Sequence, residues 1–258
     1  MTQALTPREA QTLLDDHPGW YHTMDLLPGL ATAGFADLRP LLSRALPDDL
    51  SGKRCLDVGT FDGFWAFAME DRGAASVVGI DVDASEDLEH PPLKRAANVA
   101  AAHASGIVPG TGFRLAKHIR GSQARRVTCN VYDLTADKIG GPVDFVLVGT
   151  ILQHLRSPVT ALERIRDVLA PGGVAVIVET VHAGLSLLHP RLPVGEFRAG
   201  SDKGSFTWTV ANLALVKAWP AAVGMPPTGR RAALFKPKNS GRFDWVAAVE
   251  VRPDGSLP

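Results

Sequence analysis

The sequence predicts an α/β fold: a doubly wound, Rossmann-like, mostly parallel seven-stranded sheet with an antiparallel late strand and an N-terminal helical cap. Three observations support this prediction. Residues 53–83 have the pattern of a strand, a glycine turn, a helix and a second strand. The run VDFVLVG at 143–149 is almost continuously apolar, which is typical of a parallel strand covered on both faces. Strand and helix patterns then keep alternating, so right-handed crossover connections are expected.

The composition is that of an ordinary globular chain. Of 258 residues, 45% are hydrophobic and 21% are charged. Lys and Arg number 27, as do Asp and Glu, which argues against strong attraction to nucleic acid or to an anionic membrane. The only two cysteines, Cys55 and Cys129, fall in expected strands and favour a reducing compartment over a disulfide scaffold. With no run near ~18 apolar residues, we expect a soluble cytoplasmic protein without a membrane segment.

Before the first core strand, residues 1–50 are expected to form an N-terminal helical cap or lid. Short helices are predicted at about 7–16 and 36–46, on either side of the aromatic and polar segment GWYHTMDLLPG. Residues 51–258 are expected to form the core. Within it, residues 181–228 begin with a long irregular Gly- and Pro-containing connection and are expected to form an insertion on the substrate side.

The core elements follow from local patterns. Gly59 and Gly63 bracket the first turn, the helix from residue 64 stops near Gly73, and the second strand ends at Asp81. A helix is expected to start near Leu93, another after Ser157-Pro158, and a third at about 209–218. The remaining strands are expected at 126–131, 143–149, 173–180, 229–235 and 243–251.

The polar groups at the carboxyl ends of the first two strands predict a nucleoside-cofactor site. A glycine turn lets the backbone approach a ligand, and Asp81 is placed to accept from a ribose diol. A dinucleotide is disfavoured, because Phe61 stands where a phosphate-approaching glycine would be and Asp62 adds negative charge. A triphosphate loop is disfavoured as well, because Ser51-Gly52-Lys53 precedes the strand.

S-adenosylmethionine fits these residues best. It is a cation without phosphate, and Asp57 suits its ammonium and sulfonium end. A doubly wound domain that kept its turns without a ligand remains the alternative.

Several segments resemble class I S-adenosylmethionine-dependent methyltransferases. They are LDVGTFDGFWAF, GIDVD, DFVLVGTILQHLRSPVTALERIRDVLAPGG and Glu179-Thr180. Within that superfamily, these segments are most similar to relatives of the tRNA wobble-uridine carboxymethyltransferase, and the similar region includes WYHTMDLLPG and FTWTVANLALVKAWPAAVGM. This similarity runs from about Trp20 to Gly224.

The resemblance implies a set of cofactor contacts, with S-adenosyl-L-homocysteine as product. Gly59 and its neighbours, up to Gly63, would pass under the methionine moiety, and Asp81 would hold the ribose hydroxyls. The remaining implied contacts are Val82 against the adenine, Asn130 and Val131 at the adenine edge, and Gly149 beside the sulfonium end. Asn130 replaces a commoner aspartate and would meet the adenine amino group more weakly.

Departures from the carboxymethyl-transferring relatives concern the substrate and the form of the cofactor. Those relatives carry a tyrosine where this chain has Gln153, and their basic N-terminal region and late carboxylate-binding arginine have no clear counterpart. Ordinary S-adenosylmethionine is therefore expected, and tRNA is a weak candidate substrate. Gln153-His154 resembles the Glu-His position at which some relatives bind a divalent metal, but glutamine and the lack of a carboxylate cluster predict no metal.

Methyl transfer to a hydroxyl needs a base near neutral pKa, which favours histidine. The candidate catalytic residues are His22 before the core, His154 after the fourth strand and His182 after the fifth. Each has a structural alternative: a lid contact for His22, a loop-stabilising role for His154 and an exposed position for His182. Glu179 is expected to make a structural hydrogen bond. Aromatic residues that could wall a substrate pocket are Trp20, Tyr21, Phe35, Phe206 and Trp208.

The sequence thus predicts a methyltransferase acting on a hydroxyl or nitrogen of a small molecule, in secondary metabolism. The competing functions are tRNA wobble-uridine modification, transfer or cyclisation of the aminocarboxypropyl arm of the cofactor, and a non-enzymatic cofactor-binding module. The expected partner is a small molecule, nucleic acid and membrane are disfavoured, and a homodimer stays open.

Overall fold

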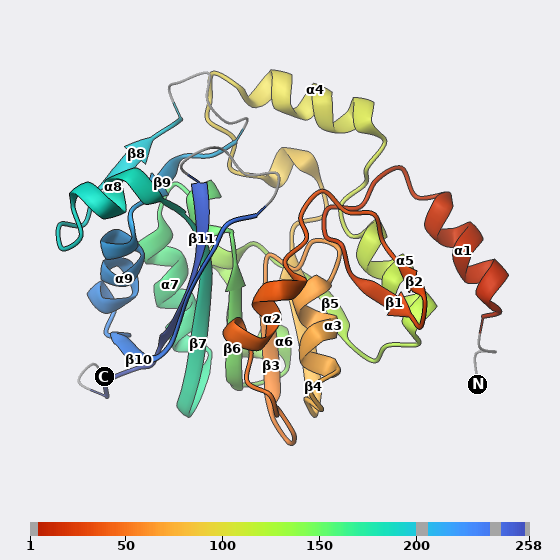
Figure 1. Cartoon of the computed structure of the whole chain (residues 1–258), viewed down its shortest axis with the longest axis horizontal. Helices are drawn as coiled ribbons and strands as arrows, with labels where there is room; N and C mark the ends of the chain where they lie inside the picture. Colours follow the sequence, from red (N-terminus) through yellow and green to blue (C-terminus); the bar gives the residue numbers. More distant parts are fainter. Residues whose placement is uncertain (1–4, 200–205, 238–243, 256–258) are drawn as a thin grey trace.

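The computed structural model describes residues 5–199, 206–237 and 244–255, and its main sheet has the strand order β10-β11-β7-β6-β3-β4-β5 (Figure 1). The strands are β3 (Arg54–Val58), β4 (Ser76–Asp81), β5 (Arg125–Thr128), β6 (Val143–Gly149), β7 (Leu169–His182), β10 (Pro227–Phe235) and β11 (Asp244–Val251). Strands β3 to β7 run parallel, while β11 is antiparallel to β7 and β10 is antiparallel to β11. The predicted fold class is confirmed. Two short strands, β8 (Gly195–Phe197) and β9 (Thr209–Ala211), extend the sheet beside the end of β7.

Helices cover both faces of the sheet. One face packs against α1 (Pro7–Asp15), α2 (Leu42–Ala45), α3 (Phe64–Glu70) and α5 (Thr111–Arg120). The other packs against α6 (Ala136–Ile139), α7 (Pro158–Asp167) and α9 (Leu213–Ala222). Successive strand residues therefore enter different cores: Leu147 joins the first cluster and Val148 the second. This double burial is why the strand sequences are continuously apolar rather than alternating.

The N-terminal cap contains a hairpin as well as helices. The expected first helix is α1, which begins with a capping box between Thr6 and Glu9. The expected second helix is shorter and consists of η1 (Arg39–Leu41) and α2. Between them, β1 (Asp25–Leu27) and β2 (Leu30–Ala31) form a hairpin that the sequence prediction missed. The pair Pro28-Gly29 is a turn signal that the sequence contains, and Gly29 adopts φ 77° at this turn.

Three core segments also differ from the prediction. Before β5 the chain forms α5, a helix that the sequence prediction did not include, and its apolar residues reach the core. The connection after β7 is partly regular, with α8 (Ala183–Leu188) and β8, while residues 200–205 of the expected insertion lie outside the described residues. The helix expected at 209–218 starts later, as α9, because β9 occupies its beginning. Helix α4 (Arg95–Ser105) arches above the sheet and contributes no residue to either core cluster (Figure 1).

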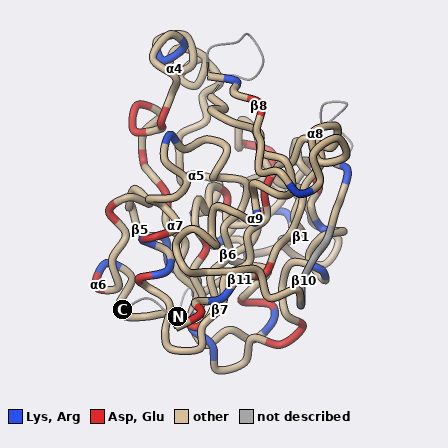
Figure 2. The backbone as a smooth tube through the Cα atoms, turned by 90° about the vertical axis from the view of Figure 1, so that its left-hand side faces the viewer, with Lys and Arg blue, Asp and Glu red and all other residues tan. Residues whose placement is uncertain are grey.

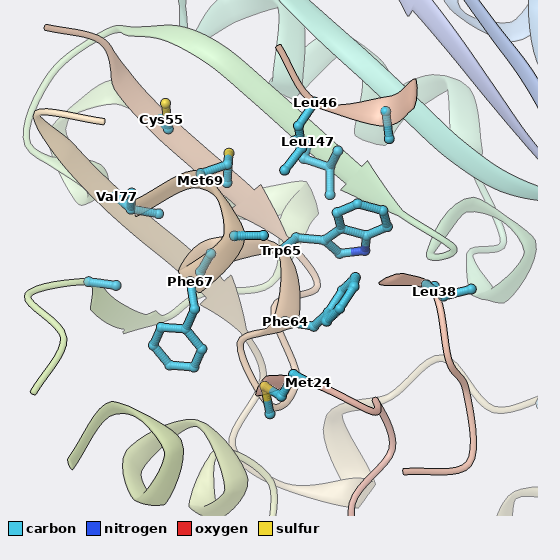
Figure 3. Close-up of a cluster of buried hydrophobic side chains, with 14 of the residues drawn as sticks. Met24, Leu38, Leu46, Cys55, Phe64, Trp65, Phe67, Met69, Val77 and Leu147 are labelled. Carbon is cyan, nitrogen blue, oxygen red and sulfur yellow. The ribbon is translucent and has the colours of Figure 1, made fainter. Parts of the chain in front are cut away.

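The cap is anchored by the first core cluster. Figure 3 shows Phe64 and Trp65 of α3 among the side chains of Met24, Leu38 and Leu46, which come from the cap. All five are buried. In the described part of the chain, no helix combines the length and apolar character needed to cross a membrane.

We expect Phe67→Ala to destabilise the protein by about 3–5 kcal/mol, because it empties part of a packed core. Phe67 is 2% exposed, lies 5.1 Å from the Phe113 ring and carries the Arg120 guanidinium 5.5 Å above it. Equilibrium unfolding in urea would measure the loss. Leu187→Ala is the control, because Leu187 is 82% exposed and its removal is expected to change stability by under about 0.5 kcal/mol. Equal effects of the two substitutions would contradict this account of the core.

Candidate active site

A hollow lies at the carboxyl ends of β3, β4, β5 and β6, where an open parallel sheet places its ligands. We call it the first hollow. Its lining includes five of the residues predicted to hold the cofactor: Gly59, Asp81, Val82, Asn130 and Val131. The other three predicted residues do not line it: Asp57 lies in β3, Gly63 directly precedes α3, and Gly149 ends β6. The structure therefore brings five of the eight predicted residues to one hollow, and their contact with a cofactor stays a prediction.

Backbone hydrogen bonds hold Asp81 at the rim of the first hollow. One carboxylate oxygen accepts from Phe61 N at 2.8 Å, and the other accepts from Val82 N at 2.8 Å. Burial raises the pKa of Asp81, while these two N–H groups oppose the rise. Phe61 has φ 46°, an uncommon conformation for a residue other than glycine. The strained turn thus serves to aim a backbone donor at the carboxylate.

Asp57 is a buried carboxylate with an unsatisfied oxygen. It has 0% exposure, and its Oδ2 accepts from Ala66 N at 3.1 Å. Its Oδ1 and the Thr60 hydroxyl do not reach hydrogen-bond geometry with any described residue, although Thr60 lies close enough to act on the carboxylate. Burial raises the pKa of Asp57 to about 7, although Thr60 and the nearby His22 lower it. An unpaired buried carboxylate is costly unless a cation approaches it, so this turn fits the positive end of the predicted cofactor.

Gly63 and Gly149 are required by packing. Gly63 precedes α3 with φ 93°, and a Cβ there would lie 2.4 Å from the Phe67 ring. A Cβ on Gly149 would lie 2.7 Å from Trp65 Nε1. Both glycines let an aromatic ring approach the backbone closely at the sheet edge.

Asn130 has its amide oriented by a local cap. Its Oδ1 accepts from Tyr132 N at 3.0 Å, at the start of the short helix η3 (Val131–Asp133). Because that oxygen is engaged, Nδ2 is the group best placed to interact with a ligand. The amide therefore suits a ring-nitrogen acceptor better than the adenine amino group that the sequence suggested.

The three candidate histidines lie in different environments and do not converge. His22 is 6% exposed and is held by Asp62, which accepts from His22 N at 2.8 Å and lies 2.5 Å from Nδ1. Its ring stacks on Phe64, with 5.0 Å between centroids. No described residue meets Nε2 with a hydrogen bond. The sequence prediction missed Asp62 as a partner and treated it only as a charge against phosphate.

His154 lines the first hollow. Its ring stacks on Phe206 with 4.1 Å between centroids, and its Nδ1 lies 3.3 Å from the Phe206 carbonyl oxygen. Burial lowers the pKa of His154 to about 4, so the ring is neutral near pH 7. The ring is therefore an uncharged flat group in the lining of the first hollow.

His182 caps a helix. Its Nδ1 accepts from Leu185 N at 3.1 Å at the start of α8, and its Nε2 lies 3.8 Å from Glu196. Glu179 also holds backbone, because its carboxylate accepts from Leu152, Gln153 and Thr180 N–H groups at 2.7–3.3 Å. Burial raises the pKa of Glu179 to about 7, against these three donors. Both groups thus fix the loops at the sheet edge.

A second hollow lies on the other side of the loop that follows β6. Thr150 and Gln153 line it, whereas Ile151 and His154 line the first hollow. The other residues of the second hollow that matter for its chemistry are Tyr21, Phe35, Thr180, Arg198, Thr207, Asp244 and Trp245. Of the aromatic residues expected to wall a substrate pocket, Tyr21 and Phe35 are found here.

The other three aromatic residues are elsewhere. Trp20 is 9% exposed in the first core cluster, Phe206 lines the first hollow, and Trp208 Nε1 donates to the Glu89 carbonyl oxygen at 2.6 Å. Within the described ranges, no group of three or more His, Cys, Asp or Glu side chains could hold a metal ion.

Comparison with known proteins agrees with this geometry. A family model described as a methyltransferase domain matches residues 30–213. No curated protein sequence gives a match. Among solved structures, the N-terminal domain of EvdMO1, solved with S-adenosylhomocysteine and D-fucose, has a TM-score of 0.60 at 16% identity, covering 98% of this chain and 99% of that one.

Two further solved structures share the fold. The 1,6-didemethyltoxoflavin-N1-methyltransferase of Burkholderia thailandensis, solved with 1,6-didemethyltoxoflavin and S-adenosylhomocysteine, has a TM-score of 0.57 at 15% identity. The alignment covers 84% of this chain and 77% of that one. The O-methyltransferase NcsB1 from neocarzinostatin biosynthesis, solved with S-adenosylmethionine and 2-hydroxy-5-methyl naphthoic acid, has a TM-score of 0.52 at 16% identity. This chain aligns over 84% of its length with 53% of NcsB1.

The buried Asp57 carboxylate predicts a pH-dependent stability. In the folded chain the Asp57 carboxyl has a pKa of about 7, whereas in the unfolded chain its pKa returns to the usual value of 3.8. Between pH 3.8 and 7 the folded state therefore binds more protons than the unfolded state. Stability should therefore fall as the pH rises through this window. From pH 5 to 7 we expect Asp57 to contribute about 2–3 kcal/mol of that fall.

Urea unfolding at pH 5, 6, 7 and 8 would test this prediction. Asp57→Asn should flatten the decline, while Asp71→Asn, at an exposed carboxylate paired with Arg120, should keep the wild-type slope. Parallel curves for wild type and Asp57→Asn would show that Asp57 does not carry this proton.

Proposed function

The chain belongs to the methyltransferase-domain family, and on that premise we propose that it transfers a methyl group from S-adenosylmethionine to a hydroxyl or nitrogen of a small molecule in secondary metabolism. The observation that carries this proposal is the first hollow, where Asp81 and Asn130 lie at the rim and the unpaired Asp57 oxygen lies under the adjoining turn. The structural neighbours solved with S-adenosylmethionine or S-adenosylhomocysteine support the choice of cofactor.

Each residue of this site has a proposed part in holding the cofactor. Asp81 accepts from the ribose hydroxyls, Val82 and Val131 contact the adenine, and Asn130 donates to its edge. Asp57 stabilises the cationic end across the turn from Gly59 to Gly63, with Gly149 supporting the same edge. When bound, S-adenosylmethionine supplies an activated methyl group and its own leaving group.

The unmodified cofactor is favoured over its carboxylated form. Gln153 is neutral, and Arg198, the cation that lines the second hollow among the described residues, is already bound to Glu196 and Asp244. A carboxylate on the cofactor would have no uncommitted cation there.

Transfer to tRNA wobble uridine is the second candidate, supported by the resemblance of the WYHTMDLLPG segment. The three arginines at positions 120, 125 and 126 are engaged within the protein: Arg120 binds Asp71, Arg126 binds Asp83, and Arg125 donates to the Ile139 carbonyl oxygen at 3.1 Å. Figure 2 shows basic and acidic residues interspersed along the backbone. These observations favour a small-molecule acceptor, since RNA binding requires a basic face.

We also propose that the segments flanking the core cover the acceptor. In the described part of the chain, Tyr21 and Phe35 from residues 1–50 line the second hollow, as do Arg198 and Thr207 from residues 181–228. Cys55 and Cys129 are both buried and unbridged, which supports a cytoplasmic enzyme.

His22 is the preferred general base of the three candidates. Asp62 orients its ring through Nδ1 and leaves Nε2 to accept a proton, the arrangement in which a carboxylate stabilises an imidazolium. Its neighbour Tyr21 lines the second hollow. By contrast, the low pKa of His154 makes it a weak base, and His182 uses Nδ1 to cap α8.

Calorimetric titration with S-adenosylhomocysteine tests the cofactor proposal. We expect binding, and we expect Asp81→Ala to weaken it at least about tenfold through the loss of charge-assisted hydrogen bonds. Asp83→Ala is the matched control, because that exposed acid follows the same strand but binds Arg126 and Thr128. No binding of S-adenosylhomocysteine at millimolar concentration would refute the proposal.

A test of the proposed base first needs an acceptor, which can be found by screening phenols and amines for production of S-adenosylhomocysteine. Mass spectrometry of the product then distinguishes methyl transfer from aminocarboxypropyl transfer. We expect His22→Ala to lower kcat about 10²–10⁴-fold and to remove the acidic limb of the pH–rate profile. His154→Ala should act mainly on cofactor affinity, and His182→Ala on stability. An unchanged pH profile in His22→Ala would exclude His22 as the base.

A further inference from the structure

We propose that the second hollow binds a neutral, aromatic, hydroxyl-bearing acceptor and discriminates against carboxylated analogues of it. This inference rests on the proposed methyl transfer and names the substrate class of the same enzyme.

The second hollow adjoins the first across a rigid partition. Thr150 has φ 49°, and its N–H donates to the Val178 carbonyl oxygen at 2.6 Å. Further along the same loop, the N–H groups of Leu152 and Gln153 donate to the Glu179 carboxylate on β7. The loop is therefore held from the β7 side at both ends, and its residues face the two hollows in turn. A molecule in the second hollow lies directly across this loop from a molecule in the first.

Aromatic rings form an apolar wall of the second hollow. The rings of Tyr21 and Phe35 are 6.1 Å apart at 31°, and Phe61 meets Tyr21 edge-on at 5.5 Å. Trp245 approaches from β11, where it pairs with Val181. Phe35 is 60% exposed and Tyr21 is 40% exposed, so both rings keep accessible surface where they line the hollow. A flat apolar ligand would cover them.

Neutral polar groups complete the lining. Gln153, Thr180 and Thr207 all line the hollow beside the rings. Amide and hydroxyl groups can each donate or accept, which matches an acceptor that carries hydroxyl groups.

The charge arrangement disfavours an anion. Arg198 Nη2 donates to Glu196 at 2.7 Å and to Asp244 at 2.9 Å, while Nε and Nη1 donate to the same two carboxylates at 2.9 and 3.2 Å. Two carboxylates thus share one guanidinium. A carboxylate on the ligand would bring a third negative charge to that group, so the pair of acids selects against it.

Two probes of similar shape test this selectivity on the full-length protein saturated with S-adenosylhomocysteine. 2-Naphthol is neutral at pH 7.5 and 2-naphthoate is an anion, and isothermal titration would give both dissociation constants. We expect 2-naphthol to bind at least about tenfold more tightly. Equal or tighter binding of 2-naphthoate, or no binding of 2-naphthol at millimolar concentration, would overturn the proposal.

Matched phenylalanine variants test the location. Phe35→Leu should weaken 2-naphthol binding at least about fivefold, because it removes a ring from the wall. Phe197→Leu should leave it unchanged, since Phe197 is 66% exposed on β8 and does not line the second hollow. Equal effects of the two variants would remove this hollow as the binding site.

A gain of affinity tests the role of the charges. Asp244→Asn releases Arg198 from one carboxylate and should raise the affinity for 2-naphthoate at least about fivefold, with little change for 2-naphthol. General structural damage would instead weaken the binding of both probes. Asp167→Asn is the control, because it alters an acid–arginine pair on α7, with Arg166. An unchanged ratio of the two affinities in Asp244→Asn would contradict the proposed selection.

The two levels of the proposal fail separately. If S-adenosylhomocysteine binds but 2-naphthol does not, the substrate class is wrong and the methyltransferase proposal stands. If S-adenosylhomocysteine itself does not bind, the proposed function fails whatever the naphthalene probes show.

Discussion

The burial of the parallel sheet on both faces is the constraint on which the rest of the molecule depends. Because helices cover both sides of β3, β6 and β7, nearly every side chain inside the strands is apolar. Polar chemistry is therefore confined to the carboxyl edge, where strands give way to turns. Both hollows lie at that edge. The cap adds to the edge rather than to the sheet, and Phe64 and Trp65 anchor it there.

Buried carboxylates organise this edge in three ways. Glu179 is satisfied by three backbone donors and fixes the loop between the hollows. Asp62 is satisfied by His22 and joins the cap to the first turn. Asp57 keeps one oxygen without a described partner. The first two are structural supports that lower the cost of their own burial. The burial of the third favours either its neutral form or the approach of a cation, which distinguishes it from the two supporting carboxylates.

The parts of the fold and site that follow from local pattern were predictable from the sequence. Strand-end residues such as Asp81 and Asn130 could be placed because the carboxyl ends of parallel strands meet at one edge. Contacts between distant segments could not: His22 and Asp62 are separated by 40 positions, and Arg198 and Asp244 by 46. The helix before β5 was missed because basic residues at its last turn masked the apolar face of α5. The division between lining and supporting glycines depends on ring packing, which periodicity does not encode.

The distribution of charge links the two proposals. Lys and Arg balance Asp and Glu over the whole chain, yet among the described residues acids outnumber basic residues in the linings of the two hollows. Asp81, Asp87 and Glu89 line the first hollow, and Asp37 and Asp244 line the second together with Arg198. Such a field favours a cationic donor and a neutral acceptor over any anion. A neutral hydroxyl that gains a methyl group must lose a proton. The acidic surroundings keep that proton close, and an imidazole backed by a carboxylate can hold it. We propose His22, held by Asp62 at the boundary of cap and core, for this role.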